Sequence, residues 1–575
     1  MTATSTNRAI PQSLPLPKMR QRPWLLSWRS APRFSSVADG ERATMTAGNW
    51  NFGDLLDIAA ANVPTDRPAL VRGDRTIAWG EFDCRTNRLA RAMLASGLKT
   101  GDRVAILARN IPEFIEIACA AFKARLTHVN INYRYTTAEI EYVLADCGAA
   151  ALFHQDEFAG VVEPLPAALD HLRLVVQIGG EGSYDRMVEE GDGTPLGIAR
   201  SPEDGYLLYT GGTTGRPKGV MWAAGDARAV QLEAPTVRNP VLTLEDHAKQ
   251  VAANITPGRV LPACPLMHGA GLNSSMAELL MGGTAVLLEK DSFRADDLWD
   301  QVEGHQVTRI LIVGDVFARP MLQALEAEPG RWDLSCLKVI SSAGLMWSEE
   351  VKRGLVRQLP QLTLVDILGA SEASGFGYAV TTATRETPTG YFEPGRQTVI
   401  IDVDTDRVLA DDEPGTGWLA RRPPFAQGYF GDPEKTAQTY RTIGGITYAI
   451  PGDMAERTVE GLIRLIGRGN LCINTGGEKV FVEEVEEALK RAPGIEDAIV
   501  VGVPDETWGK AVVALVRTGA TYDEDAARTA LAADLARYKL PRRIIVLDDL
   551  PRHASGKSDY RRATELAVAH LALAA

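Results

Sequence analysis

The sequence predicts an α/β protein, with a large N-terminal domain of parallel βα sheets plus a small β subdomain, followed by a small α+β C-terminal domain. Apolar runs of strand length alternate with helical patterns up to around residue 390, which is typical of parallel sheets covered by helices. From there to Ile466, shorter β-rich pieces are punctuated by Gly and Pro, which favours a small β subdomain. After Val480, helical and strand patterns combine in a compact unit of about 100 residues.

The individual elements follow from the spacing of the apolar residues. Between Gly80 and Gly97 the apolar side chains fall on one helical face, which predicts a helix. A second helix is expected from Pro112, because proline suits the first helical turn. Runs of strand length lie at 104–107, 127–131, 149–153, 174–178, 206–209, 285–289, 309–313 and 337–341. The C-terminal unit is expected to contain an acidic helix from Val480, strands at 498–503 and 511–516, a helix at 525–537 and a strand at 543–547.

Composition excludes several classes of protein. With 575 residues, 45% of them hydrophobic and 23% charged, the chain can bury a substantial core, so wholesale disorder is excluded. A net charge of −13 argues against nucleic acid as a partner, because phosphate binding requires a basic face. No apolar run reaches the roughly 18 residues of a membrane-spanning helix. The cysteines are scattered without a C-x-x-C pair, so we expect reduced core thiols and a cytoplasmic location: Cys84, Cys119, Cys147, Cys264, Cys336 and Cys472.

The first 45 residues differ from the rest of the chain. They carry seven basic side chains but only two acidic ones, are rich in Pro and Ser, and show no helical or strand period. Their apolar stretch is too short for a secretory signal, although the composition faintly resembles a transit peptide. We expect either a disordered basic tail or a translation start placed too early, with Met45 as the working start.

A glycine-rich loop follows the strand-like run at 206–209. It extends from Thr210 to Val220 and combines four glycines with threonine hydroxyls and one lysine. Glycines let the backbone turn tightly and point N–H groups at an anion, so the loop predicts phosphate binding, with a flexible surface loop as the alternative. It matches neither the P-loop nor the G-x-G-x-x-G pattern. The candidate phosphate-binding residues are Thr210, Gly211, Gly212, Thr213, Thr214, Gly215 and Lys218.

This loop resembles the phosphate loop of the adenylate-forming, or AMP-binding, superfamily, which includes acyl-CoA synthetases. Further segments resemble that family's motifs in the family's order, over roughly residues 49 to 565. They are Pro265–Gly269 for the acyl-tunnel gate, Ser342–Gly344 beside adenine, Leu368–Glu372 for the Y-G-x-T-E motif, Pro451–Asp453 for the T-G-D motif, Gly467–Asn470 for the hinge, Thr475–Val480 for the loop after it and Ser555–Lys557 for the C-terminal lysine motif. The departures keep the essential charges, although Leu368 replaces a tyrosine that flanks adenine.

The resemblance implies a division of the chain and a role for each matching residue. Residues 46–468 would form the AMP-binding domain, and residues 469–575 a mobile C-terminal domain that rotates about the hinge Asn470. Lys557 would bridge the carboxylate and the α-phosphate, Glu372 would reach an ATP-bound Mg²⁺, and Ser371 the α-phosphate. Asp453 would accept the ribose hydroxyls, and Arg468 would reach ribose and phosphate oxygens. The loop of Gly476, Gly477 and Glu478 would help shape a tunnel for the thiol of CoA, and Gly344 and Gly369 would be further nucleotide contacts. For each charged residue taken alone, a solvated loop position remains the alternative.

The implied substrate pocket lies in the large domain. It would include His268, Val313 and Asp315, although a lone histidine is more often a satisfied core residue. Phrases at 209–215, 312–315 and 472–480 resemble a narrower group, bacterial acyl-CoA synthetases for fatty acids and steroid side-chain acids. The histidines form no H-x-x-x-H or Cys/His cluster, so no structural zinc is expected.

The resemblance therefore implies an AMP-forming acid–thiol ligase of fatty-acid metabolism or steroid degradation. ATP, Mg²⁺ and CoA would act with a hydrophobic carboxylic acid, releasing AMP and pyrophosphate, with neither nucleic acid nor an integral membrane span. Two alternatives stay open: a stand-alone adenylation enzyme that loads a carrier protein, and a non-catalytic nucleotide-binding protein. The oligomeric state is left open, a dimer included.

Overall fold

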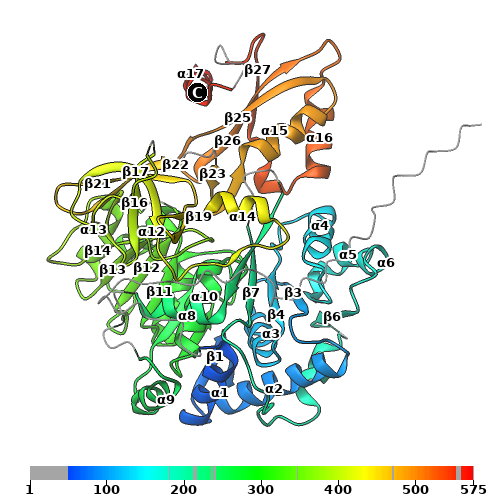
Figure 1. Ribbon diagram of the computed structural model, residues 1–575, viewed down its shortest axis with the longest axis vertical. Coiled ribbons are helices and arrows are strands. Elements are labelled where there is room, and N and C mark those ends of the chain that lie inside the picture. The colour runs from blue at the N-terminus through cyan, green and yellow to red at the C-terminus, as the bar shows by residue number, and fades with distance from the viewer. Residues whose placement is uncertain are drawn as a thin grey trace, which may run out of the picture. The chain divides into compact units, whose positions relative to one another are not determined.

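The computed structural model describes residues 50–180, 182–210, 216–234, 237, 241–345, 347–403, 405–468, 472–551 and 558–573. Within these ranges the larger part of the chain is built on two sheets with helices on their faces (Figure 1). The alternation of strands and helices in the sequence therefore gives the expected mixed α/β architecture.

The first sheet has seven strands in the order β18-β8-β7-β4-β3-β5-β6. Its strands β3 to β7 pair in parallel, and β8 returns antiparallel to β7. The bounds are β3 Arg103–Leu107, β4 Thr127–Asn130, β5 Ala151–Gln155, β6 Leu174–Ile178, β7 Gly205–Thr210, β8 Lys218–Ala223 and β18 Gly428–Tyr429. All five strands expected between residues 103 and 210 are present, within two residues of the predicted bounds at either end.

The second sheet begins as a parallel sheet around β9 to β13. β1 pairs with β10, β10 with β9, β9 with β11, β11 with β12 and β12 with β13, all in parallel. These strands are β1 Pro68–Arg72, β9 Arg259–Pro262, β10 Thr284–Leu287, β11 Arg309–Ile312, β12 Val339–Ala343 and β13 Thr363–Leu368, with β2 Arg75–Ala78 antiparallel at the edge. The β1–β2 hairpin was not anticipated from the sequence.

The expected small β subdomain is present, and its strands continue the second sheet. β14 Gly377–Thr381 pairs antiparallel with β13, and β15 Tyr391–Pro394 links β14 to β22 Ile463–Arg468. The remaining strands are β16 Thr398–Ile401, β17 Gly415–Arg421, β19 Tyr440–Ile443, β20 Ile446–Ala449 and β21 Asp453–Arg457. One hydrogen-bonded path of strands thus runs from the parallel strands into the β-rich region.

Two helices lie between the sheets. α3, Pro112–Lys123, is buried along its whole length and contacts β3 and β4 of the first sheet and β1 of the second. α10, Gly269–Leu279, contacts β9, β10 and β11. On α10, Asn273 accepts a hydrogen bond from Tyr206 of β7 at 3.4 Å. A helix enclosed on all sides is expected to be apolar around its circumference, as α3 largely is.

Other helices cover the outer faces and connect the strands. In chain order they include α1 Phe52–Asn62, α2 Trp79–Ala95, α4 Thr137–Cys147, α8 Ala224–Leu232, α9 Leu244–Ala253, α11 Ala295–Gly304, α12 Gly314–Ala327, α13 Glu349–Gln358 and α14 Pro433–Thr439. The side chain of Asn51 caps α1 by accepting the N–H of Asp54 at 2.7 Å. α2 and α3 begin within a residue of the positions predicted from the apolar periodicity and from Pro112.

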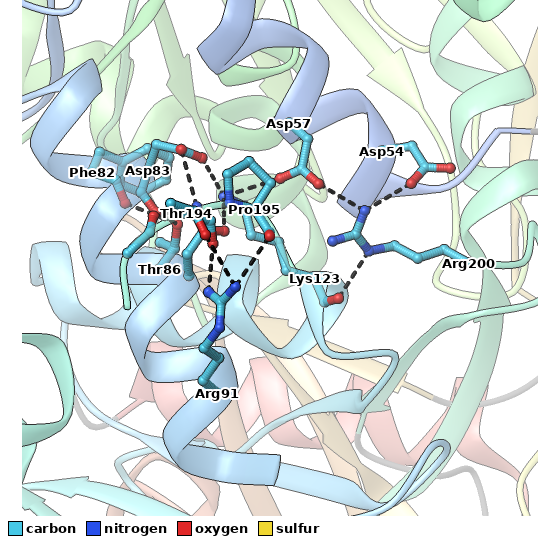
Figure 2. A network of polar contacts seen from close by, with 12 residues as sticks. Asp54, Asp57, Phe82, Asp83, Thr86, Arg91, Lys123, Thr194, Pro195 and Arg200 are labelled. Carbon is cyan, nitrogen blue, oxygen red and sulfur yellow. Dashed lines mark hydrogen bonds and ion pairs between the residues drawn. The ribbon is translucent and has the colours of Figure 1, made fainter. Parts of the chain in front are cut away.

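A polar network fastens the segment around Thr194 to Arg200 onto the first three helices (Figure 2). Arg200 lies 2.8 Å from both Asp54 and Asp57 of α1 and donates to the main-chain oxygen of Lys123 at 2.8 Å. The buried Lys123 ammonium pairs with Asp83 of α2 at 2.5 Å and with Asp57 at 3.3 Å. Buried charges must be paired, so this network fixes a connection that has no regular secondary structure of its own.

The C-terminal part contains a three-stranded sheet with helices on both faces. β25 Ile495–Asp505 pairs antiparallel with β26 Gly509–Thr518, and β26 pairs in parallel with β27 Arg543–Val546. α15 Val482–Arg491 and α16 Glu524–Asp534 share one apolar core with the sheet, while α17 Tyr560–Leu573 belongs to a second core. The hairpin of β23 Cys472–Thr475 and β24 Glu478–Phe481 precedes α15.

None of the helices in the described ranges combines the length and apolar character needed to cross a bilayer. Among the described cysteines, Cys119, Cys147 and Cys264 are buried free thiols, as expected. Cys84 and Cys336 are also free but only half-buried; Cys336 still packs against the core, so the expectation of a core thiol was wrong for Cys84 alone.

Candidate active site

Several of the predicted site residues follow the ends of parallel strands. The glycine-rich loop follows β7, whose last residue is Thr210, and Gly344 follows β12. Gly369, Ser371 and Glu372 come directly after β13. These residues therefore lie at the carboxyl ends of strands, where open α/β sheets commonly bind their ligands. Gly211, Gly212, Thr213, Thr214 and Gly215 lie outside the described residues.

Glu372 is held from three sides. Its Oε1 accepts a hydrogen bond from the hydroxyl of Tyr429 on β18 at 2.6 Å. Its main-chain oxygen accepts the amide of Ala426 at 3.1 Å and the hydroxyl of Tyr440 at 3.2 Å. The main-chain oxygen of the preceding Ser371 accepts from the indole nitrogen of Trp222 on β8 at 2.8 Å. These contacts fix the segment after β13 against the first sheet and orient one carboxylate oxygen.

Lys218, the lysine of the glycine-rich loop, begins β8 and pairs with Asp432. Asp432 also caps α14, because its side chain accepts the N–H of Lys435 at 2.9 Å. The cap and the lysine lower the carboxyl pKa of Asp432 against the opposing effect of burial, which is the largest single contribution. Lys218 is therefore anchored at the base of the loop.

Asp453 lies at the start of β21 and is buried. Its partner in the antiparallel ladder is Arg468, the last residue of β22. The two residues predicted to bind ribose therefore face each other across one strand pair, although only the backbone of Arg468 is described. Asn470 and Lys557 lie outside the described residues, so the expectations for the hinge and for the C-terminal lysine remain predictions.

A cavity of about 130 Å³ lies among the loops that follow β3, β4, β9, β10 and β11. Its apolar wall consists of Ala263, Pro265, Leu288, Phe293, Val313 and Phe317, with the Phe293 and Phe317 rings edge to face at 4.7 Å. Its polar lining consists of Arg109, Asn110, Tyr133, Arg134, His268, Lys290, Asp291, Gly476, Gly477 and Glu478. Two residues predicted for the acid, His268 and Val313, thus share a cavity with the three predicted for the CoA loop.

Glu478 contacts three polar side chains at this cavity. Its carboxylate lies 3.3 Å from His268 Nε2 and 2.5 Å from Arg134, and accepts the side-chain amide of Asn132 at 3.2 Å. Burial alone would raise the pKa of Glu478, but His268, Arg134 and Asn132 outweigh it, so the pKa falls below its usual range. The carboxylate is therefore charged and fixed at neutral pH.

Gly344 and Gly477 both lie beside Val313. A Cβ atom at Gly344 would lie 3.8 Å from Val313 Cγ1, and one at Gly477 would lie 3.6 Å from the same atom. Both glycines have positive φ, +92° and +89°, so a side chain there would also be strained. The loop after β12 and the turn of the β23–β24 hairpin therefore meet at the cavity wall.

Asp315 takes a different place from His268 and Val313. It lies in the first turn of α12, accepts the amide of Ser348 at 2.9 Å and pairs with Arg319 at 3.1 Å. The contact with Ser348 holds the start of α13 against α12, whereas the pair with Arg319 lies within α12. Asp315 does not contribute to the described lining of the cavity.

Several lining residues were missed from the sequence, among them Arg109, Tyr133 and Arg134. The guanidinium groups of both arginines lie over the Tyr133 ring, at 5.1 and 4.8 Å from its centroid. Their positions in the sequence could have identified them, because Arg109 follows β3, and Tyr133 and Arg134 follow β4. Residues at the carboxyl ends of parallel strands commonly line a binding site. Their residue types alone match no motif.

The chain matches two family models. The model described as AMP-binding enzyme matches residues 56–430, and that described as AMP-binding enzyme C-terminal domain matches residues 484–557. The chain belongs to the AMP-binding enzyme family. The stretch between the two matches contains Asp453, Arg468 and the boundary expected at residues 468 and 469.

Curated relatives of this AMP-binding enzyme align over nearly its whole length. The medium-chain acyl-CoA ligase Mig of Mycobacterium avium is 36% identical over 539 residues, covering 88% of this chain and 96% of the relative. The 3-oxocholest-4-en-26-oate–CoA ligase of Rhodococcus rhodochrous is 36% identical over 541 residues, covering 90% and 95%. The resemblance deduced from the motifs is thereby confirmed.

Solved structures support the fold of the AMP-binding enzyme. The amide bond synthetase McbA from Marinactinospora thermotolerans superimposes with a TM-score of 0.74 at 24% identity, covering 90% of this chain and 99% of the other. The o-succinylbenzoate CoA synthetase MenE from Bacillus subtilis, bound to a product analogue, gives 0.71 at 23% identity, covering 88% and 97%. The predicted fold class is confirmed.

Proposed function

We propose that this chain is an AMP-forming acyl-CoA synthetase that activates a hydrophobic carboxylic acid with ATP and transfers the acyl group to CoA. One observation carries the proposal. The cavity that holds His268 and Val313, predicted for the acid, also holds Gly476, Gly477 and Glu478, predicted for the CoA loop. An acyl carbon and a thiol can therefore meet in one enclosed place, which is what acyl transfer requires.

In the first half-reaction, a carboxylate oxygen of the acid attacks the α-phosphorus of ATP and pyrophosphate leaves. We assign the phosphate contacts to the loop from Thr210 to Lys218 and to Ser371, and the ribose contacts to Asp453 and Arg468. Lys557 neutralises the charge that develops between the carboxylate and the phosphate. The anchoring of Lys218 and Glu372 supports this assignment, because a fixed charge needs no reorganisation during the reaction.

Mg²⁺ is part of the proposal, and Glu372 is the residue that fits it. Mg²⁺ bound to a nucleotide takes one or two carboxylates together with phosphate oxygens. Glu372 offers an oriented carboxylate of this kind, and within the described residues no group of three or more His, Cys, Asp or Glu could form a protein cage for a metal. When bound, Mg²⁺ would neutralise negative charge on the phosphates.

In the second half-reaction, the pantetheine thiol attacks the acyl carbonyl carbon and expels AMP. We assign the final approach of the thiol to the turn at Gly476 and Gly477 and the facing wall to His268. The contact between His268 and Glu478 supports this assignment, because it draws the hairpin turn against the loop after β9. We further propose domains at 46–468 and 469–575, with Asn470 as the hinge between them. Rotation about this hinge would move Lys557 out of the active site and bring the turn at Gly476 and Gly477 in.

For the acid we propose a medium- or long-chain fatty acid or a steroid side-chain acid. Relatives from Mycobacterium avium and Rhodococcus rhodochrous bear the names of ligases for medium-chain acyl groups and for 3-oxocholest-4-en-26-oate. The apolar wall around Val313 and Phe317 agrees with a hydrophobic acid. We also propose a cytoplasmic location, since Cys84, Cys119, Cys147, Cys264 and Cys336 are free thiols.

The test measures acid-dependent pyrophosphate release with and without CoA, over acids from short fatty acids to steroid side-chain acids, with mass detection of acyl-CoA. We expect pyrophosphate with a hydrophobic acid and free acyl-CoA when CoA is added. Acyl-adenylate that passes only to a carrier protein would instead indicate a carrier-loading enzyme. ATP binding without pyrophosphate release for every acid would refute the proposal and indicate a nucleotide-binding protein.

A further inference from the structure

Lys539 is buried completely between two acidic side chains from distant parts of the chain. Its side chain is 0% exposed, and its ammonium lies 2.7 Å from Glu139 Oε1 and 2.7 Å from Glu484 Oε1. Glu139 belongs to α4 and Glu484 to the first turn of α15. The rings of Tyr135 and Tyr538 lie 5.0 and 5.7 Å from the same ammonium. A lysine with these contacts joins three segments at one point.

The same surface of α4 and its preceding loop holds the cavity residue Glu478. Asn132 donates to Glu478 Oε2 at 3.2 Å and lies 3.5 Å from the hydroxyl of Tyr538, and Arg134 pairs with Glu478 Oε1. Glu139 caps α4 through Thr136, so the anchor for Lys539 is itself rigid. Residues 132–139 therefore hold Glu478 at one end and Lys539 at the other.

The chain between these contacts is short. Glu484 follows Glu478 by six positions, across the end of β24 and the start of α15. With Lys539 in place, both ends of this stretch are fixed to residues 132–139. Without it, only the Glu478 end would be fixed, and two buried carboxylates, Glu139 and Glu484, would face each other with no cation between them.

We propose that Lys539 is a positioning residue for thioester formation, because it holds the β23–β24 hairpin turn and Glu478 at the cavity through its pairs with Glu139 and Glu484. The inference rests on the proposed function, which assigns that turn to the thiol. Lys539 contacts none of the predicted adenylation residues in the described part of the chain, so its contribution is confined to the second half-reaction. A buried, doubly paired ammonium suits this task because the pairs are lost together when the segments separate.

The test compares the full chain with Lys539→Met, which keeps an unbranched side chain but removes the charge, and with Lys249→Met, an exposed lysine on α9. Pyrophosphate release without CoA reports the first half-reaction, and consumption of supplied acyl-adenylate with CoA reports the second. We expect Lys539→Met to slow the second by about tenfold or more and the first by less than about twofold. Equal slowing of both half-reactions would overturn the proposal.

Amide hydrogen exchange tests the positioning without any reaction. We expect Lys539→Met to speed exchange by about tenfold or more at residues 132–135 and 476–478, while the amides of β26 keep their protection. Unchanged exchange in both segments would overturn the proposal. If Lys539→Met does not fold, Glu484→Gln, which weakens one of the two pairs, is expected to shift both measurements in the same direction. An unmodified chain that activates no acid would refute the proposed function, while exchange would still decide the role of Lys539.

Discussion

The imidazole Nε2 of His268 lies 3.3 Å from Glu478 Oε1, although 210 positions separate the two residues in the chain. His268 follows β9 of the second sheet, and Glu478 opens β24 of the hairpin before α15. The contact draws the hairpin turn to the wall of the cavity, where an acyl carbon and a thiol are proposed to meet. The first prediction tests this contact.

Replacing Glu478 by Gln should slow transfer from supplied acyl-adenylate to CoA by about tenfold, because the neutral amide no longer holds both His268 and Arg134. Acid-dependent pyrophosphate release should change by less than about twofold. Rapid-quench measurement of the two half-reactions checks both expectations. A variant that lost pyrophosphate release first would show that Glu478 serves adenylation instead.

The pH dependence of this contact follows from the pKa of Glu478, which lies below its usual value of 4.5. A depressed carboxyl pKa stabilises the fold above the unfolded value, and that contribution is lost as the pH falls through the folded pKa. We therefore expect the stability difference between the parent and Glu478→Gln to persist down to about pH 5 and to shrink below about pH 4.5. A difference that already vanished at pH 6 would contradict the assigned contacts.

Tyr429→Phe should weaken the dependence of adenylation on Mg²⁺. The substitution removes the hydroxyl that donates to Glu372 Oε1 at 2.6 Å, so the carboxylate loses its fixed orientation. Partners that orient a metal ligand change metal affinity by about 10- to 100-fold when removed, and we expect the free Mg²⁺ for half-maximal pyrophosphate release to rise by about tenfold. Tyr440→Phe is the control, because among the described residues that hydroxyl donates to the main-chain oxygen of Glu372 and not to its carboxylate. Equal effects of the two variants would contradict a metal role for Glu372.

Lys557→Ala should abolish pyrophosphate release but spare thioester formation from supplied acyl-adenylate. A cation between carboxylate and α-phosphate stabilises only the adenylation transition state, and removing such a charge costs about 10²- to 10³-fold in rate. Single-turnover assays of the two half-reactions provide the measurement. Comparable losses in both would refute the assignment of Lys557.

The sequence was sufficient for the fold class because its signals are local. The apolar runs at 127–131 and 174–178 become β4 and β6, and Pro112 begins α3. Short apolar runs of this kind are determined by burial, which the pattern of residues reveals directly. The family motifs identified Glu372 and Gly344, but the strand β13 that precedes Glu372 was not among the strands expected from the sequence.

Contacts between distant segments of the chain could not be predicted from the sequence. Tyr133 and Arg134 match no motif, and they reach the cavity only because β4 lies beside β3 and β7 in the sheet. The pairing of Lys539 with Glu139 spans 400 positions and leaves no local pattern. Asp315 belongs to a segment that resembles the family, but its carboxylate contacts Ser348 and Arg319 and does not line the cavity. A carboxylate near the start of a helix is stabilised by the backbone amides there.

Arg421→Met should destabilise the fold by about 3–5 kcal/mol, because it leaves the carboxylate of Glu233 buried and unpaired. Arg421 is also the donor to the main-chain oxygens of Gly375, at 2.9 Å, and Pro424, at 3.1 Å, so the segment after Glu372 loses support. Urea unfolding measures the free energy of unfolding. The double variant Arg421→Met with Glu233→Gln should recover part of the loss, and a double variant no more stable than Arg421→Met would contradict the pairing.

Asp366→Asn should make stability less sensitive to pH between about pH 4 and pH 7. Burial in β13 is the largest influence on the carboxyl pKa of Asp366, and although Lys352 opposes it, the pKa rises from 3.8 to about 7. Between these values the folded chain holds a proton that the unfolded chain has lost, so the free energy of unfolding falls as the pH rises, by at most about 1.4 kcal/mol per pH unit. The asparagine variant lacks this loss, and its stability relative to the parent should therefore increase from pH 4 to pH 7. Urea titrations across that range, with the exposed Asp185→Asn on α7 (Tyr184–Glu189) as the control, provide the measurement. If the stability of the asparagine variant relative to the parent stayed flat or fell with rising pH, Asp366 would be ionised throughout this range, because Lys352 then outweighs the effect of burial on its pKa.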